Sequence, residues 1–129
     1  MAGRYLLDTN IVVALFGGQF SVKEETSKAE EIFLSSVAVG ELYYGVFSSR
    51  RVAENQSRLE HFVDAVTILA CDEVTALHFG QIKNGLRLLG RPIPDNDLWI
   101  AALSQQYGLT LVTRDKHFRA IENLAVASW

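Results

Sequence analysis

The chain has 129 residues, of which 49% are apolar and 21% charged, the balance of an ordinary globular protein with one domain, residues 1–129. Its formal net charge of −3 excludes binding of RNA or DNA by bulk positive charge, so a nucleic acid must be held by local cations or by bound metal ions. The only cysteine, Cys71, excludes an internal disulfide framework and a cysteine-based zinc site, and it predicts a reducing, cytoplasmic location. No apolar run approaches the ~18 residues that span a bilayer. Because Asp8 and Asn10 interrupt the only apolar stretch near the N-terminus, a signal peptide is not expected either.

The first predicted strand ends in a carboxylate. The run YLL at residues 5–7 is apolar, Asp8 closes it, and Thr9 and Asn10 introduce an apolar helix over residues 11–16. Buried parallel strands have continuous apolar runs, and open α/β sheets bind ligands at the carboxyl ends of such strands. Asp8 is therefore a candidate for chemistry. Aspartate also caps helices, and capping is the simpler explanation of this residue taken alone.

A polar segment at residues 17–31 follows. Two glycines end the first helix, and the spacing of Ser21 and Glu24 is that of a capping box. This pattern predicts a short polar helix, capped by Ser21 and ending near Glu30. We expect this helix to be solvated and to carry no chemistry.

The next unit places a lone carboxylate in an apolar helix. Residues 32–34 predict a second buried strand, and Ser35 and Ser36 begin a helix that extends to Gly45. Glu41 is the only charge in this stretch. Because a charge with apolar neighbours is unusual unless it is paired or binds a cation, a salt bridge to an arginine and a role in cation binding both stay open.

Two further helices are predicted between residues 50 and 91. The first begins at Arg50-Arg51, and a third strand follows it at residues 67–70. The second is capped by Asp72 and has apolar residues at helical spacing, which predicts that this side faces the core. The members of this apolar stripe are Val74, Leu77, Ile82, Leu86 and Leu89.

The same helix also carries a histidine and a basic stripe. His78 lies near the apolar stripe, and a core histidine with a satisfied hydrogen bond explains it more simply than a metal ligand does. Lys83, Arg87 and Arg91 recur every four residues. A solvated face explains these cations most simply, and a phosphate-binding edge is the alternative.

Three polar residues open the last long helix. A stiff connector at residues 90–94 leads to Asp95, Asn96 and Asp97, and Asp95 or Asn96 is expected to cap the helix. One cap is sufficient, so three polar residues are a surplus. The two aspartates also repel each other unless a cation is near.

The strand at residues 109–112 repeats the pattern of the first strand. Gly108 ends the preceding helix, and the apolar run leads into TRD at residues 113–115, so that a carboxylate again follows a buried strand. A final edge strand is predicted at residues 124–127.

Alternating strands and helices predict a three-layer α/β/α fold with a mainly parallel sheet of four or five strands. Right-handed crossovers place the carboxyl ends of all strands at one edge of the sheet. Four carboxylates are then expected to converge there, namely Asp8, Glu41, Asp97 and Asp115. The expected strands lie at residues 4–8, 32–35, 67–70, 109–112 and 124–127.

Four packed carboxylates require positive charge. Alone they would destabilise the fold, and their pKa values would rise and couple. Oxygen ligands without paired cysteine or histidine favour Mg²⁺ or Mn²⁺ over Zn²⁺. Two such ions about 4 Å apart can hold the attacking water and the leaving oxygen of an in-line phosphodiester displacement. The three histidines are scattered along the chain, and neither a Ser-His-Asp arrangement nor a Gly-rich phosphate loop is evident.

With these residues in view, the chain resembles the PIN-domain ribonucleases, in particular the VapC toxins of prokaryotic toxin–antitoxin pairs. The resemblance covers essentially the whole length, and the order and spacing of its motifs are more specific than any single motif. The motifs are LLDTN at residues 6–10, SSVAVGELYYG at 35–45, RPIPDNDLWIAA at 91–102 and LVTRDKHF at 111–118.

The resemblance implies that one acidic pocket binds the metal and performs catalysis. Asn10 and Thr113 match positions that support the acidic residues by hydrogen bonding. Asp95 is an additional acid to which the pattern assigns no role, and residues 17–31 match no motif. The residues that map onto the acidic pocket are Asp8, Glu41, Asp97 and Asp115.

The resemblance further implies a Mg²⁺-dependent endoribonuclease that leaves a 5′-phosphate and a 3′-hydroxyl, with structured RNA, often tRNA, as the usual target. It also implies a homodimer and a VapB-like antitoxin whose C-terminal arm blocks the pocket. Our candidates for contacts to RNA phosphates lie near the acidic positions in the sequence. They are Arg87, Arg91, Arg114, Lys116 and Arg119.

Three other classes of protein are considered. A signalling receiver domain needs an acidic pair after its first strand and a phosphate-accepting Asp at the end of its third, where this chain has Ala70-Cys71. A phosphatase with a nucleophilic Asp needs a second Asp two residues later, where this chain has Asn10. A metal-free binding module is disfavoured by the presence of all four acids. An absence of heat stabilisation by Mg²⁺ or Mn²⁺ would favour such a module.

Overall fold

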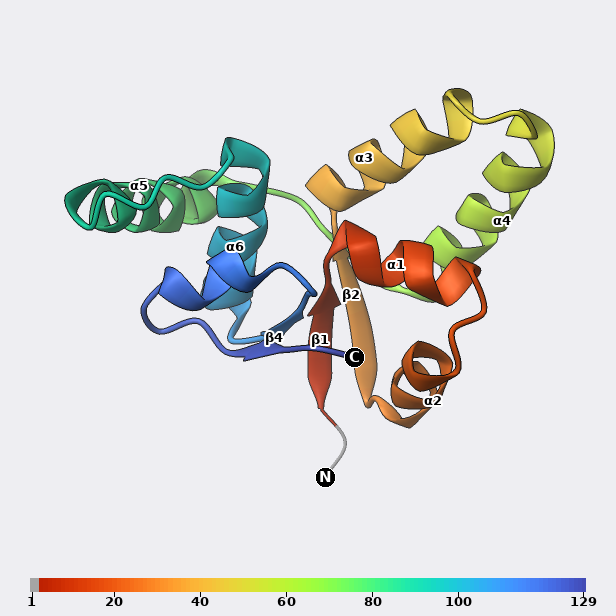
Figure 1. Ribbon diagram of the computed structural model, residues 1–129, viewed down its shortest axis with the longest axis horizontal. Helices are drawn as coiled ribbons and strands as arrows, with labels where there is room; N and C mark the ends of the chain where they lie inside the picture. Colours follow the sequence, from red (N-terminus) through yellow and green to blue (C-terminus); the bar gives the residue numbers. More distant parts are fainter. Residues whose placement is uncertain (1–2) are drawn as a thin grey trace.

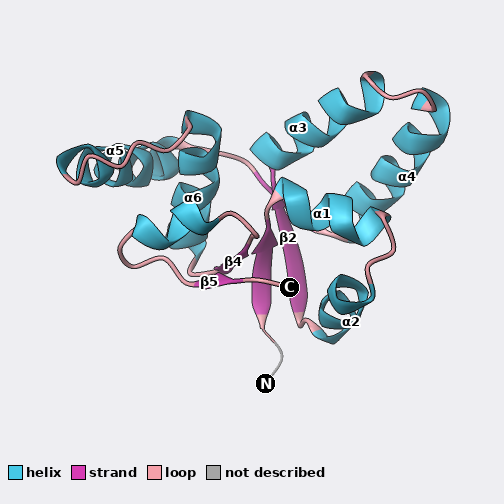
Figure 2. Cartoon of the chain, in the orientation of Figure 1, coloured by secondary structure: helices cyan, strands magenta, loops and turns pink. Residues whose placement is uncertain are grey.

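The computed structural model describes residues 3–129 and shows an α/β fold built on one five-stranded sheet (Figures 1 and 2). The paired strands are all parallel, in the order β3-β2-β1-β4-β5. The predicted α/β class and the parallel sheet are therefore confirmed. The strands are β1 (Arg4–Leu7), β2 (Glu31–Ser35), β3 (Thr67–Leu69), β4 (Thr110–Val112) and β5 (Val126–Ala127).

Helices cover both faces of the sheet. Figure 1 shows α1 to α4 on one side of the central strands and α5 and α6 on the other. Among the described residues, no helix combines the length and the apolar character needed to cross a membrane. The helices are α1 (Thr9–Phe16), α2 (Phe20–Lys28), α3 (Ser36–Phe47), α4 (Val52–Ala65), α5 (Glu73–Leu88), α6 (Asp95–Tyr107) and the short 3₁₀ helix η1 (Lys116–Ala120).

The central strand β1 joins two hydrophobic cores because its side chains alternate between the two faces of the sheet. Leu6 packs into one core with Phe33 and Leu111, and Leu7 packs into the other with Val112. Both leucines have no exposed surface. Burial on both faces explains the uninterrupted apolar run of this strand, and it holds the next residue, Asp8, at the carboxyl edge of the sheet.

The ends of the elements near this edge follow from local chemistry. Asp8 is the N-cap of α1 and accepts a hydrogen bond from the backbone N–H of Thr9 at 2.8 Å. Ser35 caps α3 in the same way through the N–H of Ala38 at 2.9 Å. Gly108 ends α6 in the left-handed conformation that favours glycine, with φ of 64°.

Two predicted caps are wrong. Helix α2 begins at Phe20 after Gln19, so Ser21 lies inside its first turn, because Gly18, with φ of 78°, turns the chain before that point. Helix α6 begins at Asp95 with Pro94 as its N-cap residue. The carbonyl of Pro94 accepts hydrogen bonds from the N–H groups of Asp97 and Leu98, so neither Asp95 nor Asn96 is needed as a cap.

The predicted apolar stripe of α5 is only partly buried. Ile82 is buried, as is Leu86, whereas Val74 is 44% exposed and Leu77 and Leu89 are each 61% exposed. The reason is that α5 packs mainly on α6, which covers the middle of the stripe. His78 is half-buried with Nδ1 3.3 Å from the side-chain carbonyl oxygen of Gln105, in agreement with a histidine that has a hydrogen-bond partner.

Candidate functional site

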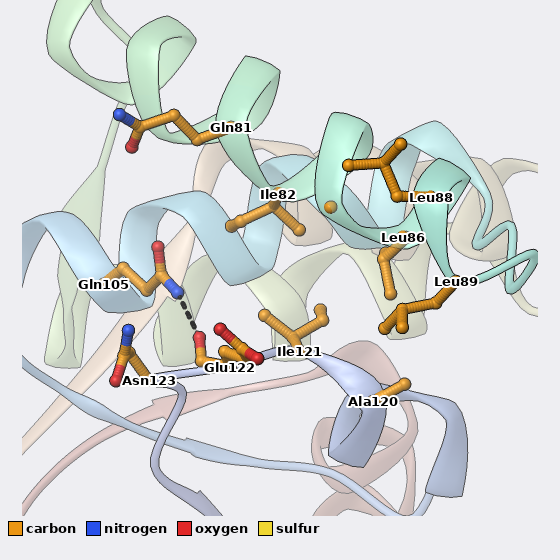
Figure 3. A pocket seen from close by; sticks show the side chains of 11 residues that line it. Gln81, Ile82, Leu86, Leu88, Leu89, Gln105, Ala120, Ile121, Glu122 and Asn123 are labelled. Carbon is orange, nitrogen blue, oxygen red and sulfur yellow. Dashed lines mark hydrogen bonds between the residues drawn. The ribbon is translucent and has the colours of Figure 1, made fainter.

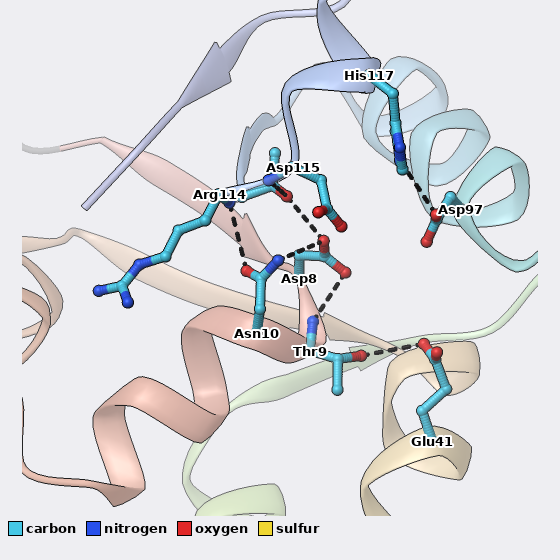
Figure 4. A network of polar contacts seen from close by, with 9 residues as sticks. Asp8, Thr9, Asn10, Glu41, Asp97, Arg114, Asp115 and His117 are labelled. Atoms are coloured by element: carbon cyan, nitrogen blue, oxygen red, sulfur yellow. Dashed lines mark hydrogen bonds and ion pairs between the residues drawn. The ribbon is translucent and has the colours of Figure 1, made fainter. Parts of the chain in front are cut away.

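The structure brings the four predicted carboxylates to the carboxyl edge of the sheet, and Asp8 is the most buried of them. Its side chain is 4% exposed. Its Oδ2 atom accepts a hydrogen bond from the hydroxyl of Thr113 at 2.8 Å, and the amide of Asn10 lies 3.5 Å from the same oxygen. Neutral donors from two segments, the start of α1 and the loop after β4, therefore fix the orientation of this carboxylate (Figure 4).

Thr113 links Asp8 to Asp115, a second carboxylate of the site. Its Oγ1 donates to Asp8 and accepts a hydrogen bond from the backbone N–H of Asp115 at 3.1 Å. Asn10 makes a similar link, because its side-chain oxygen accepts from the N–H of Arg114 at 3.4 Å. The loop after β4 is thus tied to the start of α1.

Glu41 reaches the edge from α3. Its Oε1 accepts a hydrogen bond from the hydroxyl of Thr9 at 3.0 Å. Among residues 3–129 it forms no ion pair, so its interpretation as one half of a salt bridge to an arginine is wrong. Glu41 is half-buried and its hydrogen-bond partner is a neutral hydroxyl, so the alternative interpretation, a role in cation binding, stays open.

The other two carboxylates meet beside a histidine. One ligand atom from each of Asp97, Asp115 and His117 lies within 4.8 Å of the other two. The Nε2 atom of His117 is 3.1 Å from Oδ2 of Asp97 (Figure 4). Asp97 belongs to the first turn of α6, and Asp115 directly precedes η1.

The electrostatics couple these groups. Burial raises the pKa of Asp8, although the hydrogen bonds from Thr113 and Thr9 oppose this, and the charge of Asp115 adds to the rise. Burial also raises the pKa of Asp97, with further upward contributions from Asp8, Asp115 and Glu41 that His117 partly offsets. The predicted rise in pKa is confirmed for these two aspartates, and mutual repulsion is one of its causes.

His117 is a member of the cluster that the sequence analysis missed. Its sequence position suggests only one of three scattered histidines, yet it lies two residues after Asp115 and contacts Asp97 at the start of α6. Its position next to the strand-end carboxylate is the signal that would have found it. The donor set therefore contains one imidazole nitrogen, and the preference for Mg²⁺ or Mn²⁺ rests on the carboxylates rather than on the absence of histidine.

Two other sequence candidates lie outside the cluster. Asp95 points to α5, where its Oδ1 is 3.0 Å from Nζ of Lys83 in an exposed ion pair. The guanidinium of Arg114 binds the side chain of Gln19 and the carbonyl of Trp129, and Figure 4 shows it directed away from the acidic residues.

A separate hollow of about 410 Å³ lies between α5 and the segment after η1 (Figure 3). Five leucine and isoleucine side chains are among its eleven lining residues, and the amide of Gln105 donates to the carbonyl of Glu122 there at 2.9 Å. None of the four convergent carboxylates lines this hollow, so the candidate site is the acidic edge.

Comparisons with known proteins identify the family of the chain. The family model described as PIN domain matches residues 5–124. The chain is 33% identical to Ribonuclease VapC2 of Rickettsia felis, with 97% of each chain covered. It is 31% identical to the tRNA(fMet)-specific endonuclease VapC of Shigella flexneri, with 98% of each covered.

A solved structure shows the same fold. The crystal structure of VapBC2 from Rickettsia felis, bound to a DNA fragment from their promoter, matches with a TM-score of 0.91 at 33% identity, over 98% of each chain. Together with the family match, this excludes the receiver-domain and phosphatase alternatives. The chain therefore belongs to the PIN-domain family and, within it, to the VapC ribonucleases.

Proposed function

We propose that the acidic edge is the catalytic site of this ribonuclease and that it holds a divalent cation, Mg²⁺ or Mn²⁺. The observation that carries the proposal is the convergence of Asp8, Glu41, Asp97 and Asp115 in a chain of a ribonuclease family. PIN-domain nucleases are metal-dependent, and an acidic cluster is present here.

The donor set fits a hard cation. Most of its atoms are carboxylate oxygens, which Mg²⁺ and Mn²⁺ prefer. Burial raises the pKa values of Asp8 and Asp97, and repulsion from neighbouring carboxylates adds to the rise, so a nearby cation would stabilise the charged forms. Asp8, Asp97 and Asp115 would hold the ion. Glu41 completes the acidic pocket from α3, where it accepts a hydrogen bond from the hydroxyl of Thr9.

The chain's own residues prepare this site. Thr113 and the N–H of Thr9 orient the two oxygens of Asp8, and the same Thr113 hydroxyl positions the backbone of Asp115. The Nε2 atom of His117 lies 3.1 Å from Oδ2 of Asp97 and helps to hold that carboxylate in place. Such hydrogen-bonded supports keep ligands in place before the ion or the substrate arrives.

When bound, the cation supplies Lewis-acid stabilisation of the charge that develops on the phosphate and a lower pKa for the attacking water. We propose hydrolysis that leaves a 5′-phosphate and a 3′-hydroxyl. Because the Shigella flexneri relative is a tRNA(fMet)-specific endonuclease, tRNA is the proposed substrate class.

The proposed biological role is that of a toxin neutralised by a VapB-like antitoxin. The support is the match to a VapBC complex along the whole chain. A homodimer and a cytoplasmic location stay predictions, the second because the one cysteine is unpaired and tRNA is the proposed substrate.

The test is cleavage of total tRNA by folded, antitoxin-free protein with Mg²⁺, with Mn²⁺ and with a chelator. We expect a discrete product with a 5′-phosphate in either metal and none in chelator, and we expect Asp8→Asn to yield no product. Cleavage that persists in chelator would overturn the metal assignment. A folded protein that gains no thermal stability from either metal and cuts no tRNA would support a metal-free binding module instead.

A further inference from the structure

We propose that a basic hollow beside the acidic cluster is a subsite for a backbone phosphate of the RNA, adjacent to the phosphate that is cleaved. This inference rests on the proposed function, since it assigns a part of the substrate to the same face. The hollow has a volume of about 350 Å³ and is lined by Arg91, Pro92, Ile93, Lys116, His117 and Arg119.

The hollow and the acidic cluster share a wall. His117 lines the hollow, and its Nε2 atom lies 3.1 Å from Oδ2 of Asp97 in the cluster. If the cleaved phosphate of an RNA lies at Asp97 and Asp115, a neighbouring phosphate of the same RNA backbone therefore lies at the hollow. The three cations supply the local positive charge that an acidic protein needs to hold RNA.

Two short segments carry both the cations and the carboxylates. Arg91 lies six residues before Asp97 on the connector into α6, and Lys116 directly follows Asp115. Each segment is anchored by a buried side chain, Ile93 at 8% exposed and Phe118 at 0%. Since the same anchors position both kinds of side chain, the hollow keeps its place relative to the cluster.

The cations of the hollow are free to bind a ligand. Within residues 3–129, the side chains of Arg91, Lys116 and Arg119 have no hydrogen-bond or ion-pair partner, whereas most other cations are engaged. The exceptions are the exposed Lys23 and Arg50, which do not line the hollow.

This contrast divides the five sequence candidates for RNA contacts. Arg87 donates to the side-chain oxygen of Asn84 at 2.9 Å, and Arg114 is held by Gln19 and Trp129. We assign the phosphate contact to the other three. The volume of the hollow lies at the low end of the range for small-ligand pockets, about 300–1,000 Å³, which suits one nucleotide better than a duplex.

The test uses RNA binding without cleavage. Labelled tRNA(fMet) is titrated with protein in chelator, between 50 mM and 1 M salt, and the slope of log affinity against log salt is measured. The test variant is Arg91→Gln/Lys116→Gln. The matched control is Arg50→Gln/Lys23→Gln, which also removes one arginine and one lysine that are exposed and have no ion-pair partner among residues 3–129.

We expect the test variant to bind about tenfold more weakly at 50 mM salt and to lose about 0.7–0.9 from the magnitude of the salt slope, the change for one phosphate. We expect the control to match the wild type. Equal effects of the two variants would overturn the subsite. Unchanged RNA binding with weaker binding of the antitoxin would also overturn it, because the hollow would then serve the protein partner.

The proposed function and the subsite can be tested separately. The proposed function is overturned if wild-type protein does not cut tRNA with metal present, whatever the binding data show. If wild-type protein cuts tRNA and the test variant keeps wild-type affinity and slope in chelator, only the subsite is wrong.

Discussion

The two ends of the acidic edge are built differently. At one end, Asp8 is buried and held by neutral donors, with Thr113 and the N–H of Thr9 each 2.8 Å from one of its oxygens. At the other end, Asp97 is more exposed and is opposed by three carboxylates, and the imidazole of His117 lies 3.1 Å from its Oδ2 atom. Hydrogen bonds orient the carboxylate at the first end, whereas at the second end a positive charge would relieve repulsion among the carboxylates.

Because of this difference, substitutions near Asp8 and substitutions near Asp97 are expected to have different kinds of effect. Removing a hydrogen-bond donor near Asp8 disturbs the position of a ligand and leaves buried atoms unpaired. Removing a charge near Asp97 changes the repulsion and the response to cations. The following substitutions test whether the two ends behave in these two ways.

The largest effect is expected from removing a ligand at either end. Asp8→Asn and Asp97→Asn are each expected to lower the rate of tRNA cleavage by more than about 100-fold, since loss of supporting residues alone typically costs 10- to 100-fold at metal sites. The rate is measured with Mg²⁺ and Mn²⁺, and folding is checked by circular dichroism. Asp64→Asn, an exposed change on α4, is the control. Wild-type activity in folded Asp8→Asn protein would refute the site.

Thr113→Val tests the hydrogen-bonded end. It removes the hydroxyl that donates to Asp8 and accepts from the N–H of Asp115, and it leaves both groups without this partner. We expect a loss of about 1–3 kcal/mol in the free energy of unfolding and a 10- to 100-fold slower cleavage. Urea unfolding and cleavage rates measure the two effects. Thr110→Val on the preceding strand β4 is the control, and equal losses in both variants would contradict a special role for Thr113.

The charged end is tested by pH without metal. The pKa of Asp97 is raised in the folded state, so the folded protein binds more protons than the unfolded chain above pH 3.8, the ordinary value. The free energy of unfolding therefore falls as pH rises from about 4 through the folded pKa. We expect the thermal midpoint of the wild type to drop relative to Asp97→Asn over this window.

Cations are expected to reverse that loss at pH 7. An ion at 100 times its dissociation constant stabilises by about 2.7 kcal/mol, and we expect this gain in the wild type and much less of it in Asp97→Asn. Thermal midpoints in chelator and in Mn²⁺ measure both effects. A difference between the two proteins that stays constant across pH would argue against repulsion at this end.

The smallest effect is expected from Asp95→Asn. This change breaks an exposed ion pair with Lys83 and touches none of the four convergent carboxylates. We expect a change in unfolding free energy within about 0.5 kcal/mol and unaltered cleavage. A loss of cleavage comparable to that of Asp97→Asn would return Asp95 to the acidic pocket.

The strands that end at the acidic edge were predictable from the sequence, because a local apolar run determines each of them. The apolar run before Asp8 and the run before Asp115 each predict a buried strand that ends in a carboxylate, and both lie as expected. Helix caps were less predictable. Ser21 and Asp95 both have capping chemistry, yet Gly18 and Pro94 set the helix starts instead.

The amino-acid sequence alone determined the parallel sheet, the edge at which its carboxylates meet and the motifs shared with the PIN-domain ribonucleases, because these depend on hydrophobic runs and spacing. Only the tertiary structure decided that His117 joins Asp97 while Asp95 turns to Lys83, and that Leu77 and Leu89 stay exposed. Helical periodicity indicates which residues share a face but not which neighbour covers it. Contacts between distant segments depend on how α5, α6 and η1 pack on the sheet, and no local pattern records that packing.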